Sequence, residues 1–287
     1  YPPQGGNGAP VYAQPAQQPV YYALVQPPKW ADPARLEQKE LRRAASRLSF
    51  ATMTSLPIQV LWTTLATLIL TVCGVNLMGP NTIGVFPPTA YYLISSIASF
   101  LSIVLPFSFF LFFGKRKLSD TVLVEKNGVL NSVLLVFAGL AVSVLMNIPA
   151  NLISQFLEGA GLNGDANTAD LLAMTPVQAL TMFVSVVLVA PVTEEFAFRS
   201  VTTAVMRRWG DWPAVIFSAL IFGMAHYSIQ SLPVVLTAGF VMALLYVRTR
   251  NIWVNIFVHM LNNLLATLPI ALEGLVGADA ANIASNL

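Results

Sequence analysis

The chain has 287 residues, of which 56% are hydrophobic and only 10% are charged. Soluble domains usually carry about a quarter charged residues, so this composition excludes an ordinary soluble protein and indicates a membrane protein. The formal net charge of +2 gives no reason to expect a nucleic-acid partner, and the single cysteine, Cys73, cannot form an intrachain disulfide.

The first 49 residues fall into two segments of different composition. Residues 1–30 are rich in Pro, Gln, Gly and Tyr and lack helical periodicity, which predicts a disordered cytoplasmic tail. Residues 31–49 carry five basic side chains at helix-compatible spacing, which predicts a basic juxtamembrane segment lying against an anionic leaflet. These side chains are Arg35, Lys39, Arg42, Arg43 and Arg47.

Apolar stretches long enough to cross a bilayer make up most of the remaining chain. They cover residues 51–73, 89–113, 129–148, 175–206, 213–229, 231–249 and 251–272. We therefore expect an all-α fold, a polytopic membrane helix bundle with about seven transmembrane helices, although six to eight spans fit the same pattern. Residues 50–273 would form the membrane domain, and residues 274–287 an extracytoplasmic tail.

Lysine and arginine alternate between the links that join these spans. Links 74–88 and 149–174 contain neither residue, and neither does the chain after residue 272. The other links carry Lys115, Arg116, Lys117, Lys126, Arg207, Arg208, Arg248 and Arg250. The positive-inside rule then places the N-terminus in the cytoplasm and the C-terminus outside. We expect a multi-pass protein of a bacterial cell membrane.

A few ionisable side chains fall inside the predicted spans. Glu194 and Glu195 are the only acidic residues outside the tails and links, and both histidines of the chain, His226 and His259, also lie in spans. An ionisable group inside a membrane costs several kcal/mol unless it is paired or hydrated. Each of these side chains is therefore a candidate functional group.

The polar residues of three spans fall at a similar depth. At about 1.5 Å per residue, His226 lies roughly 20 Å from the cytoplasmic end of its helix, and His259 and Asn263 lie roughly 12–18 Å from theirs. Glu195 and Arg199 also lie roughly 12–18 Å from the cytoplasmic end of their helix. This agreement favours one shared site in the cytoplasmic half over charges scattered at the membrane edge.

Spacing along the helix distinguishes the two neighbouring glutamates. Adjacent helical residues project about 100° apart, so Glu194 and Glu195 cannot face the same point. Glu195 precedes Arg199 by four residues, the favourable order for an ion pair within one helix. That pairing would leave Glu194 as the free carboxylate.

Two further pairs have a spacing of four residues. His259 and Asn263 share one helix face, and Phe222 and His226 share another, with the aromatic ring beneath the imidazole. The turn sequence "RRWGDWP" predicts a tight hairpin that brings the glutamates near His226. A carboxylate in a water-poor cavity can take a proton from water, and an imidazole and an amide can stabilise an oxyanion. These are the parts of a peptide-hydrolysing site.

Three short motifs on successive spans carry a family resemblance. "EEFAFR" fits Glu-Glu-x-x-x-Arg, "FGMAH" fits Phe-x-x-x-His and "HMLNN" fits His-x-x-x-Asn. In this order, over about residues 175–270, they resemble the CAAX protease and bacteriocin-processing (CPBP) family of intramembrane proteases. The resemblance implies a general base, Glu194, with its water-binding partner, His226; two oxyanion donors, His259 and Asn263; and a supporting pair, Glu195 and Arg199.

By this resemblance the protein would be a CAAX-like intramembrane endopeptidase. Its partners would be the lipid bilayer and membrane-associated protein or peptide substrates. Such proteases were long called metalloproteases and are now more often viewed as glutamate-dependent, so we expect no cofactor. The sequence contains no His-Glu-x-x-His zinc motif. If the reaction needed zinc, its ligands would be one carboxylate and two histidines, Glu194, His226 and His259.

Two alternatives from other functional classes remain open. A proton-coupled transporter also uses buried Glu and His, but the sequence shows no internal repeat. A catalytically silent scaffold that regulates a membrane partner would not need the complete set of motif residues that this chain contains.

Overall fold

The computed structural model describes residues 33–77, 83, 85–114, 117–162 and 175–285, with side chains described as far as Val276. The predicted tail of residues 1–30, and Lys115 and Arg116, lie outside this part. The chain divides into two compact units, Tyr1–Lys39 and Glu40–Leu287. Of the first unit, only the start of helix α1 (Pro33–Met53) is described. All the contacts below lie within the second unit.

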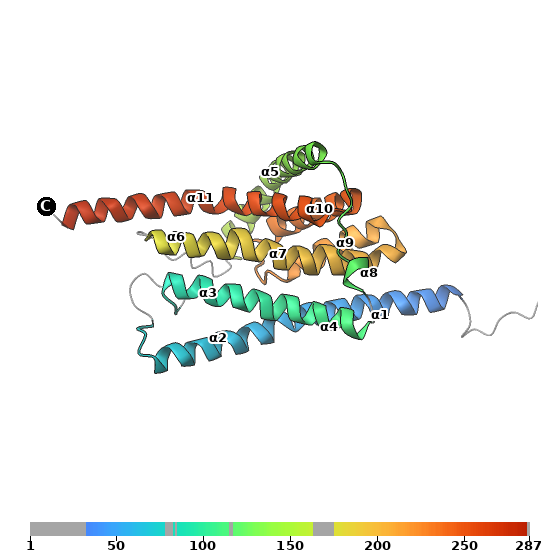
Figure 1. Ribbon diagram of the computed structural model, residues 1–287, viewed down its shortest axis with the longest axis horizontal. Helices are drawn as coiled ribbons and strands as arrows, with labels where there is room; N and C mark the ends of the chain where they lie inside the picture. Colours follow the sequence, from blue (N-terminus) through green and yellow to red (C-terminus); the bar gives the residue numbers. More distant parts are fainter. Residues whose placement is uncertain (1–32, 78–82, 84, 115–116, 163–174, 286–287) are drawn as a thin grey trace, which may run out of the picture. The chain divides into compact units, whose positions relative to one another are not determined.

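Within the described residues every regular element is a helix, and two isolated β-bridges join loop residues. Helix α1 is followed, in the colour order of Figure 1, by α2 (Ser55–Val72), α3 (Pro88–Ser99), the π-helical turn η2 (Phe100–Val104), α4 (Leu105–Phe113), the 3₁₀ turn η3 (Leu118–Asp120), α5 (Val129–Gly159), α6 (Pro176–Met182), π-helical η4 (Phe183–Val189), α7 (Ala190–Glu194), π-helical η5 (Glu195–Thr203), α8 (Ala204–Met206), 3₁₀ turn η6 (Arg207–Trp209), α9 (Asp211–Met224), α10 (Leu232–Thr249) and α11 (Ile252–Ser285).

Six helical stretches are long and apolar enough to cross a membrane. They are Pro33–Val72, Pro88–Phe113, Val129–Gly159, Pro176–Trp209, Leu232–Thr249 and Ile252–Val276. Helix α9 is apolar but has only 14 residues. The predicted all-α bundle of about seven membrane helices is confirmed. Helix α5 runs past the predicted end at residue 148 although Pro149 follows directly, and α11 runs past residue 272 although Gly274 lies just beyond it. Helix-breaking residues are tolerated inside membrane helices, so neither residue ends its helix.

The elements from α6 to η6 form one continuous rod that carries both glutamates. The rod begins at Thr175, whose hydroxyl accepts a hydrogen bond from the Gln178 N–H, while the Gln178 side chain accepts one from the Thr175 N–H. This capping box satisfies two backbone donors that a helix start would otherwise leave free. The π-helical turns η4 and η5 flank α7, where Pro191 supplies no backbone N–H. Such wide turns are frequent at functional sites.

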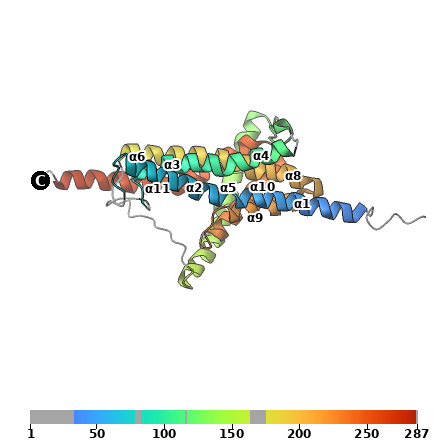
Figure 2. The ribbon, with the colours of Figure 1, turned by 90° about the horizontal axis from the view of Figure 1, so that it is seen from below.

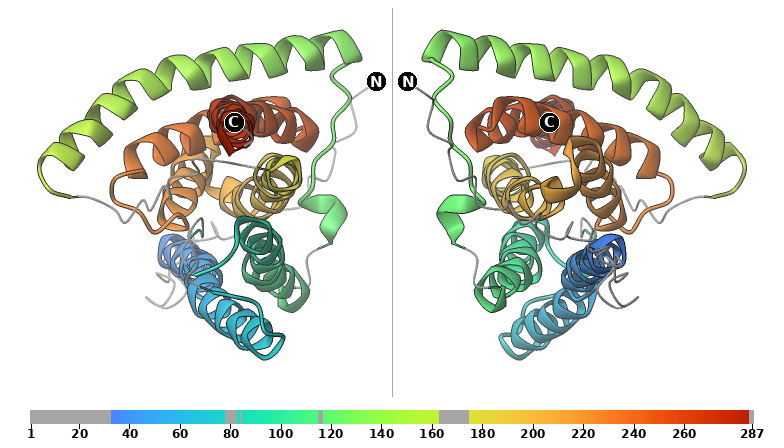
Figure 3. Two further views of the ribbon diagram at one scale, coloured as in Figure 1. Left: turned by 90° about the vertical axis from the view of Figure 1, so that its left-hand side faces the viewer. Right: turned by 90° about the vertical axis from the view of Figure 1, so that its right-hand side faces the viewer.

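This rod lies at the centre of the second unit. Figure 3, which looks along the helices, shows it between α11 on one side and α3 with α4 on the other, and α9 packs against η5. The predicted hairpin is confirmed, because Gly210 turns the chain between η6 and α9 with a φ of 114°, which favours glycine. Ser218 on α9 then donates a hydrogen bond of 2.7 Å to the carbonyl oxygen of Phe198 on η5.

Apolar side chains around η5 form the main core. Ala197, Phe198 and Val201 are almost fully buried against residues of α4, α9, α10 and α11. Outer helices instead carry exposed apolar side chains, such as Val72 and Val129, as expected of surfaces that face lipid. The site described below is therefore built on the most tightly packed helix of the unit.

Helix α5 crosses α10 and α11 at a steep angle rather than running beside them, as Figures 2 and 3 show. Gly139 lies at this crossing, where an added Cβ would come within 2.9 Å of Leu245 and 3.0 Å of Val258. The missing side chain lets the helices approach closely, as small residues do in membrane bundles.

Candidate active site

Glu195 and Arg199 form the ion pair that their spacing predicts. Both side chains are fully buried, and Nη1 of Arg199 lies 3.2 Å from Oε1 of Glu195. No guanidinium nitrogen makes a well-aligned hydrogen bond to a described residue, so the contact is a charge pair rather than a bidentate bond. The Arg199 guanidinium also lies 4.1 Å above the centre of the Phe222 ring, a cation–π contact between the rod and α9.

Glu195 also holds residues of helix α11. Its Oε1 atom lies 2.9 Å from Nδ1 of His259, and its Oε2 atom accepts a hydrogen bond of 3.3 Å from the Asn255 side-chain amide. Because a carboxylate at this distance accepts the proton on Nδ1, the other ring nitrogen of His259, Nε2, is left for further contacts. Glu195 therefore orients the histidine.

Asn255 is a site residue that the motif analysis missed. It is fully buried, and its amide nitrogen bridges Glu195 and the carbonyl oxygen of Met242, at 3.3 Å and 2.6 Å. The available signal was its spacing, because Asn255, His259 and Asn263 follow one another every four residues along a mostly apolar helix.

Glu194 differs from its neighbour in the way that the spacing predicts. Its side chain keeps 15% exposure, and Nε2 of His259 lies 3.8 Å from its Oε2 atom. Glu194 also lines a cavity of about 140 Å³, together with His226 and the hydroxyls of Ser55 and Ser102. A space of this size with polar walls can hold water.

The predicted span over residues 213–229 is too long, and His226 lies beyond the end of α9 rather than inside a helix. The helix ends at Met224, and His226 occupies the turn that follows. Its Nδ1 atom lies 2.8 Å from the carbonyl oxygen of Phe222. A carbonyl can only accept, so Nδ1 carries the proton and Nε2 of the neutral ring is an acceptor. The predicted aromatic neighbour is confirmed, with the Phe222 and His226 ring centres 4.7 Å apart.

Tyr227 forms a part of the cavity wall that sequence reasoning did not find. Its backbone has a φ of 51°, an uncommon conformation for a bulky residue and one that occurs at functional sites. Its hydroxyl lies 2.5 Å from Oγ of Ser55 and 3.4 Å from the carbonyl oxygen of Thr52, so it links the turn after α9 to the junction of α1 and α2. No local pattern reports a contact between residues 172 positions apart.

Asn263 takes a different position from the one expected of a cavity residue. Its amide donates a hydrogen bond of 2.9 Å to the carbonyl oxygen of Val186 on η4, and it is not among the described residues that line the cavity. The amide group has a second N–H, which this contact leaves available. The structure thus places Glu194 with His226 at one cavity and His259 beside Glu194, while Asn263 lies one turn further along α11.

Zinc would need Glu194, His226 and His259 to converge on one point. Among the described residues, no group of three or more His, Cys, Asp and Glu side chains has an arrangement that could hold a metal ion. Nε2 of His259 lies 3.8 Å from Oε2 of Glu194, and its Nδ1 is bonded to Glu195, a contact that is also common in metal-binding histidines. The arrangement of the three side chains in this structure therefore does not match the zinc set that the sequence offered.

Comparison with known proteins agrees with the motifs. Residues 176–265 match the family model described as type II CAAX prenyl endopeptidase Rce1-like. A relative from Bacillus subtilis (strain 168), named "Putative membrane peptidase YdiL", is 31% identical over 140 residues, which are 48% of this chain and 57% of the relative. The chain thus spans little more than half of that relative. No solved structure matches the chain.

The matched segment contains all three motifs and every residue of the cavity that comes from the rod and from the turn after α9. The protein is a multi-pass membrane protein. The resemblance is confirmed: residues 176–265 are similar to the Rce1-like, CPBP family of membrane peptidases.

Proposed function

We propose that this protein is an intramembrane endopeptidase that hydrolyses peptide bonds of membrane-associated proteins or peptides. The observation that carries the proposal is that Glu194 and His226 line one cavity of about 140 Å³, with His259 3.8 Å from Glu194. A carboxylate and an imidazole acceptor around one water are the groups that peptide hydrolysis needs.

The first step activates a water between Glu194 and His226. The Glu194 carboxylate takes one proton of this water, while Nε2 of His226 accepts the other hydrogen bond and holds the water in place. The water oxygen attacks the carbonyl carbon of the substrate, and a C–O bond forms as the carbonyl oxygen becomes an oxyanion. Removing the proton during the attack makes water nucleophilic enough to react.

The second step stabilises the oxyanion and releases the products. Nε2 of His259 can donate to the oxyanion when the ring carries a proton on both nitrogens, and the second N–H of Asn263 is a further donor. Glu194 then gives its proton to the leaving amine nitrogen, and the C–N bond breaks. The products are a new carboxyl end and a new amino end, and Glu194 is again a carboxylate.

Glu195, Arg199 and Asn255 act as positioning residues in this scheme. They are fully buried and contact one another or His259, and none of them is among the described residues that line the cavity. Their role is to fix the ring of His259 beside Glu194, which is how supporting residues preserve the geometry of a reacting site.

Comparing membrane proteomes tests the proposal and the orientation together. We also propose that the end of the bundle with Arg207, Arg208 and Arg250 faces the cytoplasm. Cells that make the wild-type protein should contain cleaved membrane proteins, cut near the cytoplasmic face, that are intact in cells making Glu194→Ala. Identical proteomes in the two strains would contradict the activity, and cuts on the outer side would contradict only the orientation.

Metal removal separates this mechanism from a zinc-dependent one. In the proposed mechanism Glu194 takes the proton from water directly, so we expect activity to be unchanged after exhaustive chelation, and no stoichiometric zinc to copurify. Activity lost on chelation and restored by zinc would instead make Glu194, His226 and His259 metal ligands.

A further inference from the structure

A second and larger groove lies beside the cavity that Glu194 and His226 line. It has a volume of about 920 Å³ and is bounded by α1, α4 and η6. Aromatic rings line much of it, including Phe50, Phe109 and Phe113, of which 70%, 56% and 77% is exposed. The Phe109 and Phe113 rings are stacked with centres 6.2 Å apart, which gives the groove a continuous apolar surface.

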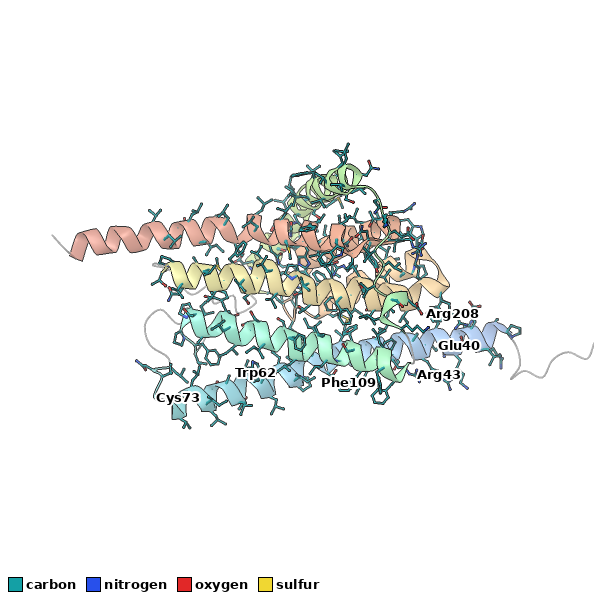
Figure 4. All side chains as sticks on the ribbon, in the orientation of Figure 1. Glu40, Arg43, Trp62, Cys73, Phe109 and Arg208 are labelled. Carbon is teal, nitrogen blue, oxygen red and sulfur yellow. The ribbon has the colours of Figure 1, made fainter. Side chains whose placement is uncertain are left out.

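The same groove carries an excess of positive charge at its edge. Arg43, Arg47 and Arg208 line it together with a single acidic residue, Glu40, which leaves an excess of two positive charges. Figure 4 labels Glu40, Arg43 and Arg208 at one end of the bundle, with Phe109 on the neighbouring α4. Glu40 is paired with Arg208 at 2.5 Å.

Arg43 and Arg47 have no counter-ion among the residues that the structure describes. They are four residues apart on α1, and like charges at this spacing destabilise a helix. Both are exposed side chains beside an apolar groove. An anion bound between them would remove this repulsion, and phosphate is a group that arginine binds well.

We propose that this groove binds one anionic phospholipid, with its phosphate between Arg43 and Arg47 and its acyl chains on Phe109 and Phe113. The positive charge of Arg43 and Arg47 complements an anionic headgroup. The separate aromatic surface of Phe109 and Phe113 suits apolar chains, so the groove fits an amphiphilic ligand. The helices that carry these residues belong to stretches long enough to cross a membrane, so lipid is the expected neighbour of the groove. An acidic peptide would match the arginines but would leave the broad aromatic surface uncovered.

The groove and the catalytic cavity share two walls. Thr54 and Ile58 line the groove, and Ser55 and Gln59, one position further along, line the cavity. On α4, Pro106 lines the groove and the next residue, Phe107, lines the cavity. A lipid in the groove would therefore contact the start of α2 and α4, which also line the cavity, whether or not the cavity is catalytic.

Native mass spectrometry of the full chain in a neutral detergent tests the proposal. Phosphatidylglycerol and phosphatidylcholine with identical acyl chains are added separately, and bound lipid is counted. We expect one phosphatidylglycerol to be retained at concentrations where phosphatidylcholine is not, and to raise the melting temperature of the protein. Equal retention of the two lipids would overturn the proposal, as would retention of neither.

Variants locate the lipid. Arg43→Gln with Arg47→Gln should bind phosphatidylglycerol about 25-fold more weakly, since each arginine near an anionic lipid contributes about fivefold. The control Arg42→Gln with Lys117→Gln removes the same charge at exposed positions outside the groove and should bind like the wild type. Equal losses in both double variants would mean that only the overall charge attracts lipid, and would contradict a defined site.

Two variants on α4 test whether the acyl chains lie on the aromatic surface of the groove. Phe109→Ala should weaken retention of phosphatidylglycerol, whereas Phe112→Ala should not, because Phe112 is 75% exposed on the same helix but does not line the groove. A headgroup that binds through the arginines alone would leave both variants unchanged, and inorganic phosphate would then compete with the lipid. That result would contradict the part of the proposal that places the chains in the groove.

Discussion

Replacing Glu195 with glutamine is expected to lower the free energy of unfolding by about 3–5 kcal/mol, because it leaves Arg199 as an unpaired charge in the core. Both side chains are fully buried, and Arg199 has no well-aligned hydrogen bond to any other described residue. The same change weakens the hold on Nδ1 of His259, so activity should fall as well. Thermal unfolding of the purified protein in detergent measures the first effect.

A second substitution distinguishes the stranded charge from a general loss of packing. Glu195→Gln combined with Arg199→Met removes both charges and keeps the volume, so part of the lost stability should return, although activity should not. Replacing a buried ion pair with an apolar pair is often neutral in stability. A double variant less stable than Glu195→Gln alone would show that the pair is not the source of the instability.

Replacing Glu194 with glutamine is expected to reduce the rate of peptide hydrolysis by about 10²–10⁴-fold while leaving the protein folded. Glutamine keeps the shape of the side chain but cannot take a proton from water. Glu194 has no contact as close as those of Glu195, and its charge neighbour is 3.8 Å away, so little stability depends on it. Steady-state rates and melting temperatures of the same preparations check both parts.

The two glutamates therefore make a matched pair of controls for each other. They are adjacent in sequence and undergo the same chemical change, yet one should lose only activity and the other should also lose stability. A stable, inactive Glu195→Gln protein together with an unstable Glu194→Gln protein would mean that the two roles are exchanged.

Contacts within one helix could be predicted from the sequence. The Glu195–Arg199 pair follows from a spacing of four residues, which local helix geometry determines. The edge-on contact of Phe222 with His226 has the same spacing, although His226 lies just past the last turn of α9. The number and kind of helices followed from the length and hydrophobicity of each stretch. The tight turn at Gly210 was likewise readable, because only a glycine readily adopts its φ of 114°.

Contacts between distant segments could not be predicted in this way. The link from Tyr227 to Ser55 depends on how α1 and α2 pack beside the turn after α9, and the bond from Asn263 to Val186 depends on the π-helical turn η4. His226 was expected inside a helix because residues 213–229 are continuously apolar, but the chain turns at Ala225 and Tyr227 takes a positive φ. Hydrophobicity reports burial in lipid and gives no signal for that turn.

Asn255 lies between these two cases. Its spacing from His259 was visible, but only the packing of α11 against the rod shows that it reaches Glu195 rather than a lipid-facing surface. A buried amide with two described acceptors and an unpartnered Oδ1 marks a polar network in which most, but not all, groups are satisfied.

The central claim is that Glu194 activates a water that cleaves peptide bonds. The most direct test incubates the purified protein with solubilised membrane proteins in H₂¹⁸O and sequences the new C-termini by mass spectrometry. The account predicts new C-termini that carry one ¹⁸O with the wild type and none above background with an equally stable Glu194→Gln protein. Labelled C-termini formed at the same rate by Glu194→Gln, or none formed by the wild type, would contradict it.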